Sequence, residues 1–443
     1  MDNKIIFKSH KIINKKNRKF LYCIYDSSLY EIDDKIEQIL AMNGCTLNEL
    51  LHQLSENKNI ESDEAKQLLQ MLYSAGLVEG LSKPIETDTE GMQLAALTLM
   101  ISQECNMKCK YCYGDGGEYK NRGKMSVETA HKAIDYLVKN SKETKLAIAF
   151  LGGEPLMNFE LMKDILNHCK IKTQETGKIF SYTITTNGTL LTPEIEDFLI
   201  KNRIKTQISI DGTEEAHNQM RYFAGKQPSY EVVVSKTKHM REQHLLTARA
   251  TLSPNNLDYV KTFNHLKELG FTGIPIEPAK NLLSEMDLKK ELDEYIRYID
   301  FFAEQVKTGQ MDTVSKMTDF TKALEKIDSS GKRNHGCGAF HKMYAVDIDG
   351  KLYPCHRFVG IPEFCLGSIF DVSVEESKLW QDVELRNKCS KCWLKNLCGG
   401  GCAYENFMET GDINIATANF CQHMELFYTA IINAYIDHKY INN

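Results

Sequence analysis

Three cysteines near residue 110 have a spacing that suits an iron-sulfur cluster. Cys105, Cys109 and Cys112 form a Cys-x3-Cys-x2-Cys pattern directly after residues 95–101, an apolar run that is typical of a strand. Three thiolates on one loop can hold three irons of a [4Fe-4S] cube and leave the fourth iron open. A structural zinc ion would need a fourth ligand, and no Cys or His follows closely enough. The pattern therefore predicts a reactive metal centre.

A second group of seven cysteines lies in the last quarter of the chain. Zinc bound in a ribbon by four of them is one interpretation, and further iron-sulfur clusters are the other. The four candidate zinc ligands are Cys389, Cys392, Cys398 and Cys402. The remaining three are Cys337, Cys355 and Cys421.

The composition predicts an enzyme with more than one domain. The chain has 443 residues, of which 42% are hydrophobic, and its net charge of -6 argues against general nucleic-acid binding. It has no apolar run long enough for a membrane span, and its polar, lysine-rich start predicts no signal peptide, so we expect the cytoplasm. In that reducing compartment, fourteen cysteines favour metal ligation over disulfides. Four cysteines outside the clusters are expected in the apolar core: Cys23, Cys45, Cys169 and Cys365.

The central residues predict an α/β fold. Between about 95 and 280 the pattern alternates six times between strand and helix, which indicates a parallel sheet with right-handed crossovers. The expected strands are 95–101, 145–151, 179–185, 205–210, 246–252 and 271–277, with helices such as 127–138 and 159–173 between them. Residues 281–334 are expected to form a helical bridge, and residues 335–443 a cysteine-rich domain ending in a helix.

Small and polar residues follow several of these strands. In sheets of this kind, ligands bind at the carboxyl ends of the strands. The second strand is followed by Gly152-Gly153-Glu154-Pro155, the third ends in Thr185-Thr186-Asn187-Gly188, and the fourth ends in Ser209-Ile210-Asp211-Gly212. Arg221 lies ten residues after Asp211 and could bind a carboxylate with two parallel hydrogen bonds. We therefore expect a polar ligand at this end of the sheet.

The first 90 residues predict a small α+β domain with a winged-helix-like shape. Two strands are expected at 20–25 and 28–32, followed by helices at 33–42, 46–55 and 62–75. Gly76 is placed to end the last helix. The polar residues 82–91 are the expected linker to the next domain. A DNA-binding wing and a plain packing domain are the alternatives for this shape.

Taken with Tyr111 in the aromatic position before Cys112, the first motif resembles that of the radical S-adenosylmethionine (SAM) enzymes. The resemblance implies an open (β/α)6 barrel and a [4Fe-4S] cluster whose open iron chelates SAM. By the same resemblance, the Gly152–Pro155 motif receives the amino group of SAM, and Arg221 binds its carboxylate. Tyr111, Gly152, Gly153, Glu154, Pro155, Thr186, Asn187, Ser209, Asp211 and Arg221 are thus the expected SAM contacts.

The C-terminal cysteines resemble those of the SPASM domain of peptide-modifying radical SAM enzymes. That likeness implies two auxiliary [4Fe-4S] clusters, and so three clusters in all. Cys389, Cys392, Cys398 and Cys421 would surround one of them, and Cys337, Cys355 and Cys402 the other. No further cysteine lies between Cys337 and Cys355, so one iron of that cluster is expected to be open to a substrate thiolate.

Residues 338–359 and 389–403, together with Gly411-Asp412-Ile413-Asn414, carry a nearer resemblance. Through them nearly the whole chain is similar to the thioether-forming ranthipeptide, or SCIFF, maturases, with sactipeptide synthases next. This similarity implies that the enzyme joins a Cys sulfur to a carbon atom in a ribosomally made precursor peptide. The N-terminal domain would bind the leader of that peptide as an added strand. A flavodoxin or ferredoxin is the expected electron donor, and neither nucleic acid nor membrane is an expected partner.

Three other functions remain open on the sequence. A sulfatase-type maturase would oxidise a Cys or Ser without forming a crosslink. A maturase that forms C–C bonds or a quinone cofactor could carry the same clusters. A winged-helix iron-sulfur or zinc regulator would bind DNA and would not use SAM.

Overall fold

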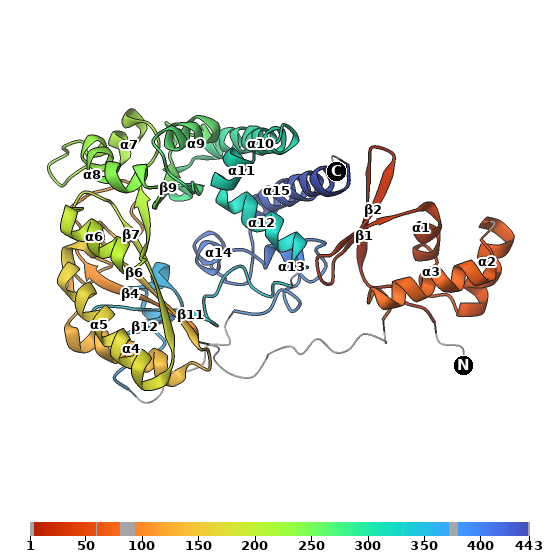
Figure 1. Ribbon diagram of the computed structural model, residues 1–443, viewed down its shortest axis with the longest axis horizontal. Coiled ribbons are helices and arrows are strands. Elements are labelled where there is room, and N and C mark those ends of the chain that lie inside the picture. Colours follow the sequence, from red (N-terminus) through yellow and green to blue (C-terminus); the bar gives the residue numbers. More distant parts are fainter. Residues whose placement is uncertain (1–3, 59, 80–93, 331, 372–379, 442–443) are drawn as a thin grey trace. The chain divides into compact units, whose positions relative to one another are not determined.

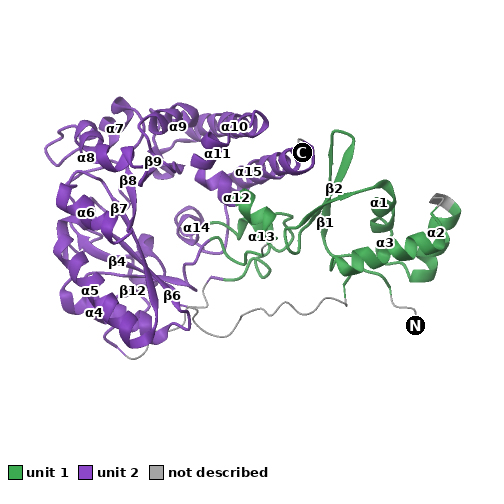
Figure 2. Ribbon diagram, viewed as in Figure 1, with its two compact units in different colours: residues 1–90, 323–336, 381–401 green, residues 91–322, 337–380, 402–443 purple. Residues whose placement is uncertain are grey.

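The structure is a computed structural model that describes residues 4–58, 60–79, 94–330, 332–371 and 380–441. The chain divides into two compact units (Figure 2). Unit 1 contains residues 1–90, 323–336 and 381–401, and unit 2 contains residues 91–322, 337–380 and 402–443. The expected linker at 82–91 lies outside the described residues.

Unit 1 begins with a three-stranded antiparallel sheet in the order β1-β2-β3, followed by three helices (Figure 1). The strands are β1 (His10–Lys15), β2 (Arg18–Cys23) and β3 (Leu29–Ile32), and the helices are α1 (Asp34–Leu40), α2 (Leu47–Lys58) and α3 (Ser62–Ser74). The sequence indicated β2, β3 and the three helices but missed β1. Lys16 and Asn17 both have positive φ, as a type I′ hairpin turn requires. The lysine-rich composition concealed this hairpin.

Residues 381–401 pack within the same unit as the N-terminal sheet. Asn396 donates hydrogen bonds to the carbonyls of Ile24 and Tyr25 at 2.6 and 2.8 Å. The Trp393 ring packs edge-on against Tyr22 at 5.8 Å. The short helix α13 (Lys395–Cys398) is therefore fixed to the hairpin between β2 and β3.

Unit 2 contains a parallel sheet whose strands follow chain order, as expected. Its central order is β10-β9-β8-β7-β6-β4. These strands are β4 (Ala96–Gln103), β6 (Lys145–Gly152), β7 (Ile179–Thr186), β8 (Lys205–Ser209), β9 (Leu246–Leu252) and β10 (Ile276–Pro278). β10 is shorter than expected, because Pro275 has no N–H to donate to a ladder and only its carbonyl bonds to Ala250.

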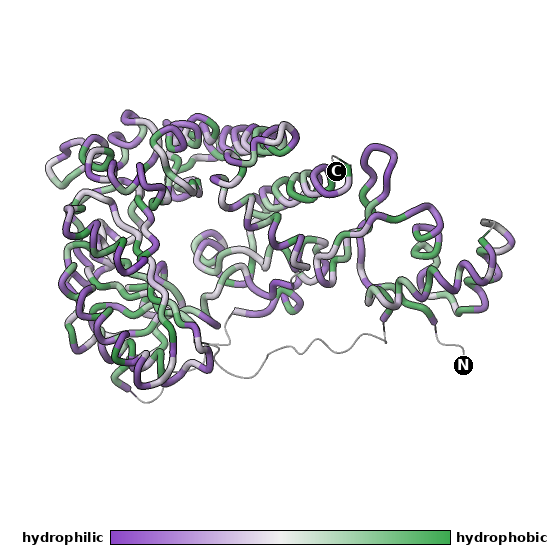
Figure 3. The backbone as a smooth tube through the Cα atoms, in the orientation of Figure 1, coloured by the Kyte–Doolittle hydropathy of each residue, from purple (hydrophilic) through white to green (hydrophobic). Residues whose placement is uncertain are grey.

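Helices connect these strands. They are α4 (Val127–Asn140), α5 (Phe159–Thr176), α6 (Pro193–Lys201), α7 (Glu214–Met220), α8 (Tyr230–Glu242) and α9 (Tyr259–Glu268). Figure 3 shows hydrophobic residues along the strands and hydrophilic residues on the outer turns of the helices, the pattern of a sheet buried by its crossovers.

Two strands from the C-terminal part extend the same sheet. β11 (Met343–Val346) pairs in parallel with β4, and β12 (Leu352–Tyr353) pairs antiparallel with β11. The buried Gln103 side chain accepts a hydrogen bond from the Ile348 N–H at 3.1 Å. The sequence did not indicate this pairing, which joins residues almost 250 positions apart.

The other elements are mostly helical. They are β5 (Gly123–Lys124), α10 (Glu285–Lys307), α11 (Met311–Lys316), α12 (Thr318–Asp328), α14 (Ala403–Thr410) and α15 (Ala418–Ile436). Four 3-10 turns lie at Pro155–Asn158, Lys280–Leu282, His356–Phe358 and Pro362–Phe364, and a π-helical turn lies at Asp437–Ile441. Among the described residues, no helix combines the length and the apolar character needed to cross a membrane.

Candidate functional site

The loop after β4 carries the three cysteines of the first motif. The Gln103 amide donates to the carbonyls of Glu118 and Asn121, which holds the loop closed over the strand end. Lys108 and Lys110 donate backbone hydrogen bonds to the carbonyls of Tyr222 and Met220. This pairing places the cysteine loop directly against the segment that contains Arg221.

The cysteine thiols of this loop lie in a poorly solvated environment. Burial raises the pKa of Cys105 to about 12 and also raises the pKa of Cys109. The Arg221 guanidinium acts in the opposite direction on both pKa values. Thiols of this kind become thiolates when a bound metal supplies positive charge, so their environment is compatible with iron ligation.

Two glycines bring the end of β6 against the cysteine loop. Gly152 has a φ of 141°, and a Cβ on it would lie 2.0 Å from the Ser102 carbonyl oxygen. A Cβ on Gly153 would lie 2.3 Å from the carbonyl oxygen of Glu104. Any side chain at either position would displace the backbone that leads into Cys105.

Glu154 connects the ends of β6 and β7. Its buried carboxylate accepts hydrogen bonds from the Thr186 hydroxyl at 2.6 Å, the Asn187 N–H at 2.8 Å and the Leu156 N–H at 3.0 Å. Burial raises its pKa, and these hydrogen bonds oppose the shift. Three donors leave about one of its four acceptor positions free for a ligand. Pro155 begins the 3-10 turn that follows it.

Asn187 extends this network to the cluster loop. Its amide donates to the Asn106 side chain at 2.9 Å and lies 4.0 Å from the Cys105 sulfur. Asn106 in turn donates to Thr189 at 2.8 Å. Asn106 directly follows the first cysteine of the motif, but the cysteine spacing alone did not indicate its role.

Tyr111, Asp211 and Arg221 form a second buried network. Arg221 Nη1 donates to the Tyr111 hydroxyl at 2.6 Å, and that hydroxyl donates to Asp211 at 2.6 Å. The other Asp211 oxygen accepts the Thr251 N–H at 3.1 Å. Burial raises the pKa of Asp211, while Arg221 and these hydrogen bonds act in the opposite direction. The network orients Arg221 beside the cysteine loop.

One edge of the Arg221 guanidinium points to a missing anion. Arg221 is 7% exposed, and within the described part of the chain its Nε is buried without a hydrogen-bond partner. Because Tyr111 occupies Nη1, the Nε–H and Nη2–H edge is the one that can bind a carboxylate with two hydrogen bonds. A buried donor without a partner is costly, so this edge fits a ligand carboxylate.

His217 is a further buried residue of this network. Its Nδ1 accepts the Asp211 N–H at 3.3 Å, so its Nε2 carries the proton and donates to Ser229 at 2.9 Å. Ser229 donates to the Arg221 carbonyl at 2.9 Å. Burial holds the His217 pKa well below its usual value, which keeps the ring neutral. In the sequence, the place of His217 in the motif Asp-Gly-x4-His-x3-Arg could have indicated its role, whereas no motif marks Ser229.

Ser209 remains apart from both networks. It ends β8, two residues before Asp211. In the described part of the chain, its hydroxyl belongs to none of the hydrogen bonds that join Glu154, Asp211 and Arg221. Its expected role in binding SAM therefore gains no support from contacts.

Cys337, Cys355 and Cys402 all belong to unit 2, and the first and last of them act on Cys355. Burial, together with the neighbouring charges of Cys402 and Cys337, raises the pKa of Cys355 to about 12. Cys402 is the residue before α14, and Cys355 precedes the turn His356–Phe358. The fold thus brings together residues 337, 355 and 402, the set that the SPASM resemblance implied.

Cys365 has a different environment. Its thiol lies 3.7 Å from the Gly367 carbonyl oxygen, to which it donates, and its side chain packs against the aromatic cluster around Phe358 and Phe364. This agrees with the expected core position of Cys365.

Of the other four cysteines of this group, Cys389, Cys392 and Cys398 belong to unit 1, and Cys421 lies in the first turn of α15 in unit 2. Within the described ranges, no three His, Cys, Asp or Glu side chains are gathered tightly enough to hold a single metal ion.

Residues 99–273 match the family model of the Radical SAM superfamily. The chain is similar to the radical SAM cyclopropyl synthase TigE of Paramaledivibacter caminithermalis, with 27% identity over 95% of this chain and 94% of that protein. It is also similar to the cysteine-type anaerobic sulfatase-maturating enzyme of Clostridium novyi, with 25% identity over 76% of this chain and 94% of that enzyme.

Among solved structures, that of Streptococcus suis SuiB bound to the precursor peptide SuiA has a similar fold. The TM-score is 0.51 at 15% identity, over 94% of this chain and 100% of SuiB. The cysteine loop, the glycine-lined end of β6 and the open edge of Arg221 are compatible with a cluster and SAM, the cofactors of the matched family. Residues 99–273 therefore form a radical SAM domain, and the chain is an enzyme.

Proposed function

We propose that this enzyme installs thioether crosslinks, from a Cys sulfur to a carbon atom, in a ribosomally made precursor peptide with a leader. The observation that carries the proposal is the second three-cysteine set, Cys337, Cys355 and Cys402, in a chain that already has one such set at Cys105, Cys109 and Cys112. Bound at these sites, the clusters and SAM would supply a carbon-centred radical and a Lewis-acid position for a substrate thiolate.

The residues at the barrel mouth would bind and orient SAM. The open edge of Arg221 would take its carboxylate, and the free acceptor position of Glu154 would take its ammonium group. The hydrogen bonds described above hold the two protein side chains in place. Thr186 and Asn187 bind the Glu154 carboxylate, and Tyr111 binds the Arg221 guanidinium. No protein acid or base is required for hydrogen abstraction, so the contribution of the chain is position and exclusion of water.

We expect Arg221→Lys to raise the KM for SAM by about tenfold or more, because lysine cannot present two parallel donors to a carboxylate. The measurement is the rate of 5'-deoxyadenosine formation against SAM concentration. Arg122→Lys, at an exposed arginine of the cysteine loop, is the matched control and should leave the KM unchanged. An unchanged KM in Arg221→Lys would show that Arg221 does not bind the carboxylate of SAM.

The N-terminal sheet supports leader binding by strand addition. β3 ends the sheet and pairs with β2 on one side. The Cys23 N–H donates to the Ser28 carbonyl, so the antiparallel alternation directs the N–H group of Glu31 away from β2, toward the edge of β3 that no described strand pairs with. An extended peptide could accept hydrogen bonds there.

We therefore expect Glu31→Pro to weaken binding of the precursor peptide by about fivefold, since it removes one hydrogen-bond donor from the open edge. Glu31→Ala keeps the N–H and is the matched control, because both variants lose the ion pair with Arg18. Fluorescence anisotropy with a labelled precursor measures the affinity. Equal affinities of the two variants would place the leader elsewhere. Deleting residues 1–90 is a less specific test, because it also removes the partners of Trp393 and Asn396.

The similarity to TigE favours C–C bond formation as a second candidate function, because TigE is named a cyclopropyl synthase and matches almost the whole chain. The sulfatase-type function is supported in the same way, because the match with the cysteine-type anaerobic sulfatase-maturating enzyme covers 94% of that enzyme.

One experiment separates these functions. The precursor is sought as a short cysteine-rich reading frame beside the gene and is incubated with the reconstituted enzyme, SAM and a reductant. Both crosslinks remove two hydrogen atoms, but only the thioether also removes a thiol that iodoacetamide can alkylate. We expect loss of two hydrogens together with loss of one alkylation site. Loss of two hydrogens with every thiol retained would indicate a C–C bond, and conversion of a Cys to an aldehyde would indicate sulfatase-type chemistry.

A further inference from the structure

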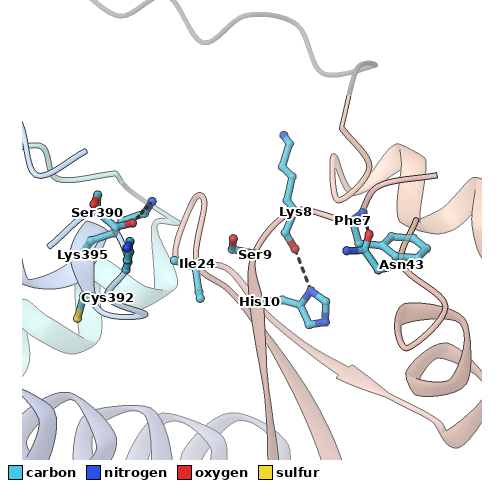
Figure 4. A pocket seen from close by; sticks show the side chains of 10 residues that line it. Phe7, Lys8, Ser9, His10, Ile24, Asn43, Ser390, Cys392 and Lys395 are labelled. Atoms are coloured by element: carbon cyan, nitrogen blue, oxygen red, sulfur yellow. Dashed lines mark hydrogen bonds between the residues drawn. The ribbon is translucent and has the colours of Figure 1, made fainter. Parts of the chain in front are cut away.

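Unit 1 contains a pocket of about 410 Å³ that the SAM-binding networks do not use. Its lining comes from two parts of the unit: Phe7, Lys8, Ser9, His10, Ile24 and Asn43, and Ser390, Lys391, Cys392 and Lys395. Figure 4 shows the Lys8 side chain standing between the 390–395 segment and the pair Phe7 and Asn43. The Asn43 side chain accepts the Phe7 N–H at 2.8 Å, and the Lys8 N–H donates to the Leu77 carbonyl at 2.8 Å, so this wall is fixed.

The pocket lining is basic. Three of the ten lining residues are lysines and one is His10, and none carries a carboxylate. Lys395 already has partners, since it binds Glu384 at 2.7 Å and the Ser390 carbonyl at 3.1 Å. His10 Nδ1 lies 2.8 Å from the Lys8 carbonyl oxygen, to which it donates, which leaves its Nε2 for another group. Lys391 is exposed.

Lys8 is the residue that indicates a missing ligand. It is 9% exposed, and its Nζ is fully buried with no hydrogen-bond partner among the residues that the structure describes. The contact recorded for this ammonium is with the face of the Tyr25 ring, at 3.7 Å from the ring centre. A ring face offsets only part of the hydration that a buried ammonium loses, and buried charges in proteins are normally paired. The pocket therefore has an unpaired cation and no anion to match it.

We propose that this pocket binds an oxyanion, with Lys8 as its main partner and Lys391 and His10 as secondary donors. The same chemistry fits a Glu or Asp side chain of the bound peptide and a free anion such as phosphate. The anion site itself does not depend on the proposed function, but a peptide source for the carboxylate rests on it.

The basic lining of the pocket has a second possible explanation. Cys392 lines the pocket and is an expected cluster ligand, so the lysines could instead compensate the charge of a cluster. If the lysines compensate a cluster, loss of Lys8 should change the reduction potential of that cluster, and the pocket should bind no anion. An oxyanion site predicts anion binding that depends on Lys8.

The test uses the full-length reconstituted enzyme with inorganic phosphate and glutarate as probes, at constant ionic strength set with chloride. We expect each probe to raise the melting temperature by about 2 °C over chloride. In Lys8→Met the rise should vanish, and the melting temperature without the probe should not fall, because an unpaired buried charge is removed. Lys142→Met, at an exposed lysine of unit 2, should behave as wild type.

No rise in the wild type, or a full rise in Lys8→Met, would overturn the site. If Lys8→Met does not fold, crystals of wild-type enzyme soaked in selenate decide the matter. We expect an anomalous selenium peak beside Lys8 Nζ, and a pocket without this peak would overturn the proposal.

Peptide variants then identify the source of the anion. If the anion belongs to the peptide, we change its Asp and Glu residues to Asn and Gln one at a time. One of these changes should weaken binding of the peptide to the wild-type enzyme about tenfold and leave its binding to Lys8→Met unchanged. If no position does so, the source is a free anion. Failure of the crosslinking reaction with probe binding intact would refute the proposed function alone.

Discussion

We expect Cys109→Ala to abolish the cleavage of SAM to 5'-deoxyadenosine by anaerobically reconstituted enzyme with a reductant. Three cysteines hold the cluster of this family, and two cannot keep a cube in place. The alanine would also remove the thiolate that faces Arg221, whose positive charge acts on Cys109. Chromatography of the nucleoside product measures the loss.

Cys45→Ala is the matched control for this experiment. Cys45 is a partly buried cysteine packed against the core of unit 1, far from the first motif in sequence. The Cys45→Ala variant should retain full SAM cleavage. This result would separate the loss of a cluster ligand from the general effect of removing a cysteine. Unchanged cleavage in Cys109→Ala would contradict the assignment of the first motif.

The second large effect is expected for Cys402→Ala, which should stop crosslinking before it affects SAM cleavage. Cys402 lies beside Cys355, whose pKa it helps to raise, and removing it leaves the second set with two thiols. The first cysteine set and the Arg221 network contain none of these residues. Mass spectrometry of the peptide and assay of 5'-deoxyadenosine, from the same reaction, measure the two activities.

Cys365→Ala provides the control within the same region. Its thiol donates to the Gly367 carbonyl, so its loss should leave crosslinking intact. Full thioether formation by Cys402→Ala, or loss of it in Cys365→Ala alone, would show that the ligand set is misassigned. A crystal structure with four protein ligands on each auxiliary cluster in the presence of peptide would also refute an open position.

Local patterns in the sequence predicted much of the parallel sheet and of the site. Apolar runs separated by amphipathic helices were sufficient to locate all six central strands, and glycine or polar residues marked the ends where ligands bind. Tyr111 and Arg221 were identified through motif spacing. Their shared hydrogen bond was not foreseeable, because it joins residues 110 positions apart and depends on how the loop after β4 meets the end of α7.

Other features left little local signal. β1 was missed because lysines conceal its alternation, and β10 was overextended because the apolar residues before Pro275 are typical of a strand. Ser229 was missed because a lone serine resembles many surface serines, although its hydroxyl joins His217 to the Arg221 carbonyl. Lys8 was counted only as one of several basic residues, since burial without a partner is visible only in three dimensions.

The pairing of β4 with β11 has a consequence for synthesis of the chain. β4 carries the cysteine loop at its end, where the two-residue strand β5 pairs with Ser102 and Gln103, yet the strand along the rest of its outer side comes from residues 343–346. At a translation rate of about 5–20 residues per second, the intervening stretch takes roughly 10–50 s to leave the ribosome. During that time β4 is an edge strand, with unpaired backbone groups that can join another chain. A nascent chain stalled before residue 343 should therefore be more prone to aggregation than one stalled after β12.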